Sequence, residues 1–412
     1  MKKIISLFLV FAMLFSLSAA GTAKEIVYAA GDPNNDGVVN SSDALLVLKN
    51  SVGEEKLSSA QLAASDINRD KKANSSDALL ILQISIGLCI NYGNFKTLDY
   101  NWMINAENNY KEFISEVKAN KNLIPFIASS DQHGTVKADC EVFEFINDLV
   151  DWSSISKILN LGDTVYMVYN EAELKAYSKA METVPVEKRL ELYGNHDGHA
   201  SVTPFDMKDY FVAYGAEKSE NSDAFSVYDK QFNVRYIAVD PMNYPWSYTG
   251  GRITSSQADF IVNELQKNDS ADIVFLSHPY LFRDAIISRD GTVFTGSEYF
   301  IGGEARGADT KQSFLDMLLA RKEKRAGVFK DSNGKEHPYD FTGCKGNFLM
   351  TLHGHHHAEG YETFNGITQF MFQSFRYDEQ NCFYFACIDR KERTFKCWKN
   401  IPGNDAWEFE IA

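Results

Sequence analysis

Short apolar runs recur through residues 121–412, and amphipathic stretches separate them. This alternation predicts an α/β core in which helices cover buried strands. One helix is expected over Glu107–Lys118, where four apolar side chains recur at helical spacing. The strands are expected at Leu123–Ala128, Ile158–Leu161, Leu190–Tyr193, Ile273–Leu276 and Phe348–Leu352.

Each of the five runs is followed by side chains that commonly bind metal ions. Open α/β sheets place ligands at the carboxyl ends of their strands, so five such endings in series favour a metal site over five separate caps. Carboxylate, imidazole and amide donors suit Mn, Fe or Zn, and the lack of thiolates argues against a closed structural zinc site. The donors suffice for two ions about 3.5–4 Å apart that share a carboxylate. The candidate ligands are Asp131, His133, Asp163, Asn195, His278, His355 and His357.

The order of these motifs resembles that of the calcineurin-like metallophosphoesterases. The family pattern is D-x-H, G-D, G-N-H-D/E, a lone His and G-H-x-H, and all five elements stand in that order within residues 121–400. The resemblance implies that residues 121–412 form an α/β (α+β) four-layer sandwich, with two mixed sheets packed face to face between helices. It further implies that Asp163 bridges two metal ions. The first ion would also bind Asp131, His133 and His357, and the second Asn195, His278 and His355.

The same resemblance implies hydrolysis of a phosphomonoester or phosphodiester by a metal-bound hydroxide. His196 is then expected to protonate the leaving oxygen or to hold the phosphoryl group, with Asp197 orienting its ring. One alternative is a catalytically silent binding protein with the same fold, carried on a scaffold. A metal-dependent peptidase is a weaker alternative, because the chain lacks H-E-x-x-H.

Two calcium loops are predicted before this domain. Asn40–Leu46 recurs letter for letter as Asn74–Leu80, and oxygen-bearing side chains precede each copy at the spacing of an EF-hand loop. Position six is Gly37 in the first loop and Lys71 in the second. Because that position needs a left-handed backbone, the second loop is expected to bind calcium more weakly. The predicted calcium ligands are Asp32, Asn34, Asp36, Val38, Asp43, Asp66, Asn68, Asp70, Lys72 and Asp77, with Val38 and Lys72 acting through their carbonyls.

The duplicated loop-plus-helix pattern resembles a type I dockerin over residues 31–90, with helices expected at Asp43–Asn50 and Asp77–Ile86. The resemblance implies docking to a cohesin domain of a scaffold protein, as in cellulosomes. Its expected contact residues are Ser41, Ser42, Ser75 and Ser76. The alternative is a calcium-binding repeat without a partner.

The remaining features concern export and charge. Lys2 and Lys3 precede an apolar run and then small residues, which predicts a signal peptide within residues 1–30 and a secreted, cellulosome-associated protein. Residues 91–120 are expected to form a linker and a lead-in helix. A net charge of -15 argues against nonspecific nucleic-acid binding. Six cysteines permit disulfides, with Cys382, Cys387 and Cys397 the closest neighbours.

Overall fold

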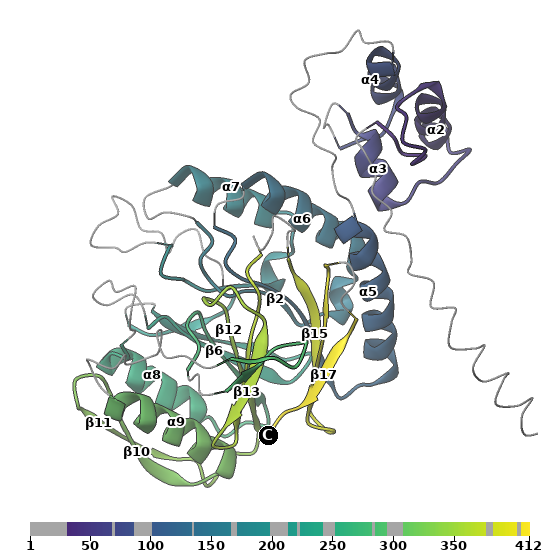
Figure 1. Ribbon diagram of the computed structural model, residues 1–412. Coiled ribbons are helices and arrows are strands. Elements are labelled where there is room, and N and C mark those ends of the chain that lie inside the picture. The colour runs from purple at the N-terminus through teal and green to yellow at the C-terminus, as the bar shows by residue number, and fades with distance from the viewer. Residues whose placement is uncertain are drawn as a thin grey trace, which may run out of the picture. The chain divides into compact units, whose positions relative to one another are not determined.

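The computed structural model (Figure 1) describes most of the chain after residue 30. The chain divides into two compact units, Met1–Ile104 and Asn105–Ala412. The expected signal peptide and residues 91–100 of the expected linker lie outside the described residues. The described ranges are 31–67, 71–85, 101–133, 136–165, 171–197, 213–220, 223–241, 252–281, 285–294, 308–375, 382–401 and 405–412.

The first unit contains three short helices, α2 (Ser41–Ser51), α3 (Ser59–Ser65) and α4 (Ser75–Ser85). Helices α2 and α4 follow the two predicted loops, as expected. Helix α3 was not predicted; a capping box in which Ser58 and Gln61 bond to each other's backbone N–H fixes its start. A small core holds the unit together, and it consists of Ala44, Val47, Ile67, Ala78 and Ile81.

A six-stranded sheet forms one inner layer of the second unit. The strand order is β17 (Trp407–Glu410), β16 (Thr394–Lys399), β15 (Tyr384–Asp389), β1 (Leu123–Ser129), β2 (Lys157–Asn160) and β3 (Arg189–Glu191). Strands β1, β2 and β3 are parallel, and β15 pairs antiparallel with β1, so the sheet is mixed as predicted.

A nine-stranded sheet forms the other inner layer. The order is β4 (Glu217–Lys218), β5 (Ala224–Asp229), β6 (Val234–Val239), β7 (Asp272–Ser277), β12 (Phe348–His353), β14 (Ile367–Met371), β13 (Gly360–Phe364), β8 (Ile286–Ile287) and β9 (Val293–Phe294). Strands β6, β7, β12 and β14 are parallel, and antiparallel strands extend both edges. Strands β10 (Ala326–Lys330) and β11 (Glu336–Asp340) form a separate hairpin.

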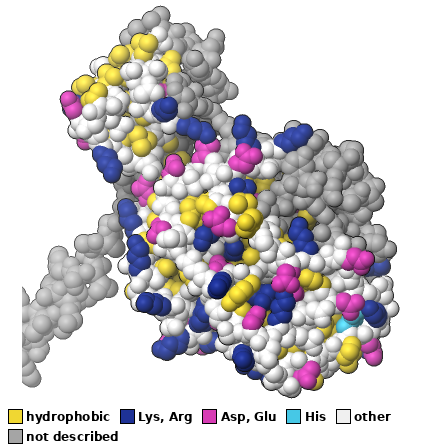
Figure 2. All heavy atoms as spheres, turned by 180° about the vertical axis from the view of Figure 1, so that it is seen from behind, with side chains coloured by type: hydrophobic (Ala, Val, Ile, Leu, Met, Phe, Trp, Pro, Cys, Tyr) yellow, Lys and Arg dark blue, Asp and Glu magenta, His cyan; other side chains and the backbone are white. Residues whose placement is uncertain are grey.

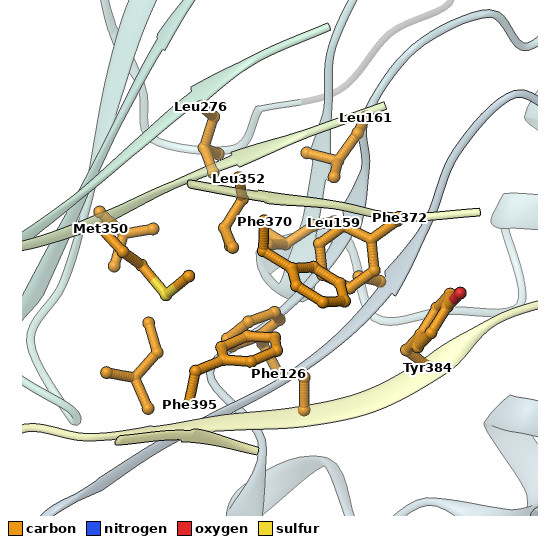
Figure 3. Packing of buried hydrophobic residues seen from close by; sticks show 14 of the residues in the cluster. Phe126, Leu159, Leu161, Leu276, Met350, Leu352, Phe370, Phe372, Tyr384 and Phe395 are labelled. Carbon is orange, nitrogen blue, oxygen red and sulfur yellow. The ribbon is translucent and has the colours of Figure 1, made fainter. Parts of the chain in front are cut away.

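The two sheets bury a shared apolar core. Phe126 and Leu159 of one sheet meet Met350 and Phe370 of the other (Figure 3), and none of these side chains exceeds 1% exposure. Full burial of one such side chain stabilises the fold by about 1.5–3 kcal/mol. The strong apolar character of the predicted strands is thereby explained, since both faces of the central strands are covered.

Helices cover the outer face of each sheet and complete the predicted four-layer sandwich (Figure 1). Helix α5 (Asn101–Ala119) packs on the six-stranded sheet through Phe113, which stacks on Phe385 and meets Trp398 edge-on. Helices α8 (Ser255–Leu265) and α9 (Ala308–Glu323) cover the nine-stranded sheet. None of the helices in the described parts of the chain has the length and apolar character that a bilayer crossing requires. The other helices are α6 (Val136–Leu149) and α7 (Glu171–Met181), with single 3₁₀ turns at Trp152–Ser154 and Val186–Lys188.

Two details differ from expectation. Helix α5 is longer than the predicted lead-in helix, and the compact unit begins within it, at Asn105. The three cysteines that are closest in sequence, for which a disulfide was possible, do not pair. Cys382, Cys387 and Cys397 are buried free thiols, as is Cys344.

Candidate metal centre

Five loops bring the predicted metal ligands together, and each loop follows a strand end. Strands β1, β2 and β3 run parallel in one sheet, and β7 and β12 run parallel in the other. Parallel strands deliver their following loops to the same edge of a sheet, so residues far apart in sequence meet there. The candidate ligands follow these strands in order: Asp131 and His133, Asp163, Asn195, His278, and finally His355 and His357.

The first group comprises Asp131, His133, Asp163 and His357, whose donor atoms all lie within 4.8 Å of one another. His133 Nε2 lies 2.8 Å from His357 Nε2, and His357 Nε2 lies 3.2 Å from Asp131 Oδ1. His357 is half exposed and the other three residues are buried. His357 is therefore the member of the group that solvent reaches most readily.

The second group centres on His278, which is fully buried. Its Nε2 atom lies 3.2 Å from Asp163 Oδ2, 3.1 Å from Asn195 Oδ1 and 3.2 Å from His355 Nδ1. The donors of Asp163, His278 and His355 lie within 4.8 Å of one another. Asp163 thus belongs to both groups, which is the arrangement that a pair of neighbouring cations needs.

The donor set fits divalent cations. Ligand atoms bonded to one ion at about 2.0–2.2 Å lie about 3–3.5 Å from each other, close to the spacings observed here. Burial lowers the pKa of His133 to about 4 and that of His355 to about 3, so both rings are neutral at pH 7. Burial opposes protonation of His278 as well, but the Asp163 carboxylate outweighs it and raises the pKa of His278 to about 10. A cation bound there would displace that proton.

The backbone of these loops is unusual. Asp131, His133, Asp163, His355 and His357 all have φ between 50° and 74°, in the left-handed region that L-residues seldom adopt. Such conformations cost about 1–3 kcal/mol each and concentrate at functional sites.

Glycines let the loops approach one another closely. A Cβ at Gly194 would lie 2.1 Å from Asp163 Oδ1, and one at Gly354 would lie 1.8 Å from Ser130 Oγ. A Cβ at Gly162, whose φ is 100°, would meet the His278 ring at 2.7 Å. The glycines of the G-D, G-N-H-D and G-H-x-H motifs are therefore required by close packing around the candidate ligands.

Asp197 forms hydrogen bonds to the backbone of two loops. Its Oδ2 accepts from the Gly194 N–H at 2.7 Å and its Oδ1 from the Val165 N–H at 3.0 Å. These bonds join the loop after β3 to the loop after β2. Burial, followed by the charge of Asp163, raises the pKa of Asp197 to about 8. Asp197 therefore connects two backbone segments, and its part in orienting the His196 ring stays a prediction.

His196 lies beside the first group. Its backbone N–H donates to Asp163 Oδ1 at 2.7 Å, and its half-buried ring meets the His133 ring edge-on at 4.7 Å. His353, which precedes the G-H-x-H motif, is fully buried and contacts the Ser277 carbonyl and Thr351 Oγ1. The contact with Ser277 joins the ends of β7 and β12.

The first calcium loop is compact, since donor oxygens of Asp32, Asp36 and Asp43 lie within 4.8 Å of one another. Asp43 is buried and accepts from the backbone N–H groups of Asn34 and Asn40. Burial raises its pKa. A bound cation would offset the cost of burying that carboxylate beside two other acidic residues.

The second loop repeats the arrangement in part. Asp77 is buried like Asp43 and accepts from the Ile67 and Asn74 N–H groups. Lys71 has φ 69°, so the left-handed conformation expected at position six is present without a glycine. Of the predicted ligands, Asp66 and Lys72 are described, whereas Asn68 and Asp70 lie outside the described residues.

The candidate cohesin contacts lie at the starts of the two matching helices. Ser41 and Ser42 begin α2, Ser75 and Ser76 begin α4, and all four are exposed.

Comparison with known proteins identifies the N-terminal segment. Residues 30–83 match the family model of the dockerin type I domain, so this part of the chain is a dockerin. None of the curated proteins compared with the chain matches it.

Solved structures similar to the chain include a dimetal phosphatase from Danio rerio, with 11% identity and a TM-score of 0.40 over 70% of this chain and 99% of that one. A predicted phosphoesterase from Streptococcus pneumoniae has 14% identity and a TM-score of 0.31 over 70% of this chain and 97% of that one. GAP50 of Plasmodium, an inner membrane complex anchor, has 9% identity and a TM-score of 0.39 over 70% of this chain and 89% of that one.

Proposed function

We propose that the second unit hydrolyses a phosphomonoester or phosphodiester with the help of two divalent ions (Mn, Fe or Zn). The observation that supports this proposal is the sharing of Asp163 between two donor groups drawn from five separate loops. A structural metal site needs one closed donor set. Two adjoining groups that share Asp163, with His357 half exposed, suit a reaction in which two cations would act together on one phosphate ester.

The ions, when bound, would lower the pKa of water and neutralise charge on the phosphoryl oxygens. The protein's own residues position and transfer protons. Asp163 is held by the His196 N–H, and the Asp197 carboxylate keeps the loops after β2 and β3 together. The His196 imidazole, beside His133 and partly open to solvent, then protonates the leaving oxygen or holds the phosphoryl group.

The test combines metal analysis with hydrolysis of bis-p-nitrophenyl phosphate and p-nitrophenyl phosphate in added Mn²⁺. We expect two bound ions and turnover in the parent protein, and loss of both the ion pair and turnover in Asp163→Asn. Asp229→Asn is the matched control, because Asp229 is a buried aspartate at a strand end that bonds Ser156 away from the site. A parent protein that binds two ions but hydrolyses neither ester would favour the silent binding protein instead.

We also propose that the dockerin attaches the enzyme to a cohesin domain of an extracellular scaffold. The matched exposed serines at the starts of α2 and α4 support two equivalent binding faces. Pull-down by scaffold cohesins in calcium is the test. Retention that persists unchanged in chelator, or no retention in calcium, would contradict it.

A further inference from the structure

A buried lysine lies behind the candidate metal centre. Lys399 is the last residue of β16 and pairs across the sheet with Tyr384 of β15. Its side chain is 8% exposed, and its Nζ donates to Glu359 Oε2 and to Gln373 Oε1, each at 2.7 Å. Burial of an ammonium group is costly unless it is paired, so this position needs a specific explanation.

The bond to Gln373 leads to the loop of Asp131. The Gln373 N–H donates to the hydroxyl of Tyr384, so the Tyr384–Lys399 pair holds Gln373 at both its backbone and its side chain. Figure 3 shows Tyr384 at the edge of the apolar core. The next residue, Ser374, donates from its Oγ to the Asp131 carbonyl at 2.9 Å. The N–H of the following residue, Phe375, donates to the carbonyl of the residue before Asp131 at 2.7 Å.

The bond to Glu359 leads to the loop of His355 and His357. Glu359 follows His357 by two residues, is buried, and also accepts from Arg289 Nη2 at 2.6 Å. At its other end, this loop bonds the first, because the His355 N–H donates to Asp131 Oδ2 at 2.9 Å. Lys399 therefore bonds one of these loops directly, at Glu359, and reaches the Asp131–His133 loop through Gln373 and its neighbour Ser374. The two loops bear three ligands of the first group.

The position of Lys399 is itself fixed. Its carbonyl accepts from the side-chain amides of Asn109, at 2.8 Å, and Asn105, at 3.2 Å, both on helix α5. The ligands on the two joined loops have left-handed backbones, which persist only where the surrounding structure restrains them. A rigid strand end with two bonds toward these loops provides such a restraint.

We propose that Lys399 is a positioning residue, which holds the Asp131 and His355–His357 loops at the separation that metal binding requires. This inference rests on the proposed function. Partners behind the ligands typically change metal affinity by about 10- to 100-fold when removed. A purely structural lysine would affect only the melting temperature.

The experiment measures Mn²⁺ dissociation constants of the full chain by calorimetry at 25 °C, together with melting temperatures. Lys399→Met is compared with Lys157→Met. Lys157 is equally buried, donates to the Glu187 carbonyl at 2.6 Å, and lies at the opposite end of β2 from Asp163. We expect both variants to melt earlier, but only Lys399→Met to bind Mn²⁺ about 10- to 100-fold more weakly.

Unchanged Mn²⁺ affinity in Lys399→Met, or an equal loss in Lys157→Met, would overturn the inference while leaving the proposed function intact. A parent protein that binds none of Mn²⁺, Fe²⁺ and Zn²⁺ would overturn both. If Lys399→Met does not fold, Gln373→Met decides, because it removes only the bond toward Asp131 and introduces no unpaired charge. Weakened Mn²⁺ binding in that variant supports the inference, and parental binding refutes it.

Discussion

Gly194→Ala tests whether the candidate metal centre requires the close contact between the loops after β2 and β3. A methyl group at Gly194 would lie 2.1 Å from Asp163 Oδ1 and 2.2 Å from the Asp163 backbone nitrogen. Rotation of the carboxylate relieves only the first of these contacts. The loop after β2 must therefore move by nearly 1 Å, roughly the gap to a tolerable contact, and overpacking of this kind costs about 1–3 kcal/mol.

The expected result has two parts. The melting temperature falls by a few degrees, and turnover falls by roughly 100-fold, because a misplacement of about 1 Å at a reacting site has that effect. Turnover of bis-p-nitrophenyl phosphate, bound Mn²⁺ and thermal scans measure these changes. Gly343→Ala is the control, since the nearest atom to an added Cβ there is 4.0 Å away. Parental turnover and stability in Gly194→Ala would show that the loops do not meet as described.

Further predictions concern His196, the calcium loops and His353. His196→Ala should retain both metals, because the bond from His196 to Asp163 comes from the backbone, which alanine keeps. Its turnover should fall by at least roughly 100-fold, since an acid–base group is lost. Metal analysis and kinetics check this, and unchanged turnover would remove His196 from the mechanism. Calcium titration should give unequal sites, and Lys71→Gly should strengthen the weaker one about fivefold, from the roughly 1 kcal/mol cost of a left-handed lysine; equal sites in the parent contradict this. Burial lowers the pKa of His353 to about 3. Its contribution to the free energy of unfolding is therefore present above about pH 6.5 and is lost as the pH falls toward 3, at about 1.4 kcal/mol per pH unit. Denaturant titrations in chelator should show that the free energy of unfolding depends less steeply on pH in His353→Gln than in the parent. An identical slope would refute this prediction.

The part of the site that could be predicted depends on residues that are close together in the sequence. Asp131 and His133 stand directly after an apolar run, and the same is true of Asp163 after β2, so chain order already indicates a common sheet edge. The four-layer fold was predicted correctly from the resemblance of these motifs and agrees with the alternation of apolar runs. The dockerin could also be predicted from the sequence, because two near-identical segments show the spacing of the calcium ligands directly.

The unpredicted part depends on contacts between distant segments. Lys399 reaches Glu359 and Gln373 only because β16 pairs with β15 in the register that places it opposite Tyr384. In the sequence it is one of three lysines in the last 33 residues, and no motif marks it. Asp197 was expected to orient the ring of its neighbour His196, and its oxygens also accept backbone N–H groups from two loops. Sequence adjacency gave no information about these bonding partners.

The candidate centre has a strained backbone at its ligands and hydrogen bonds that hold the ligand-bearing loops in place. Five ligand-bearing positions adopt left-handed backbones, and at about 1–3 kcal/mol each their combined cost is comparable to the whole stability of a typical domain. The loops must therefore be restrained by contacts outside the ligand set. Asp197 restrains the loops after β2 and β3, and His353 joins the ends of β7 and β12. Lys399 links the loop after β12 to the segment after β14, which in turn bonds the loop after β1 through Ser374. Because each restraint connects a different pair of strand ends, removal of one should misplace its own pair of loops and leave the others close to their original positions.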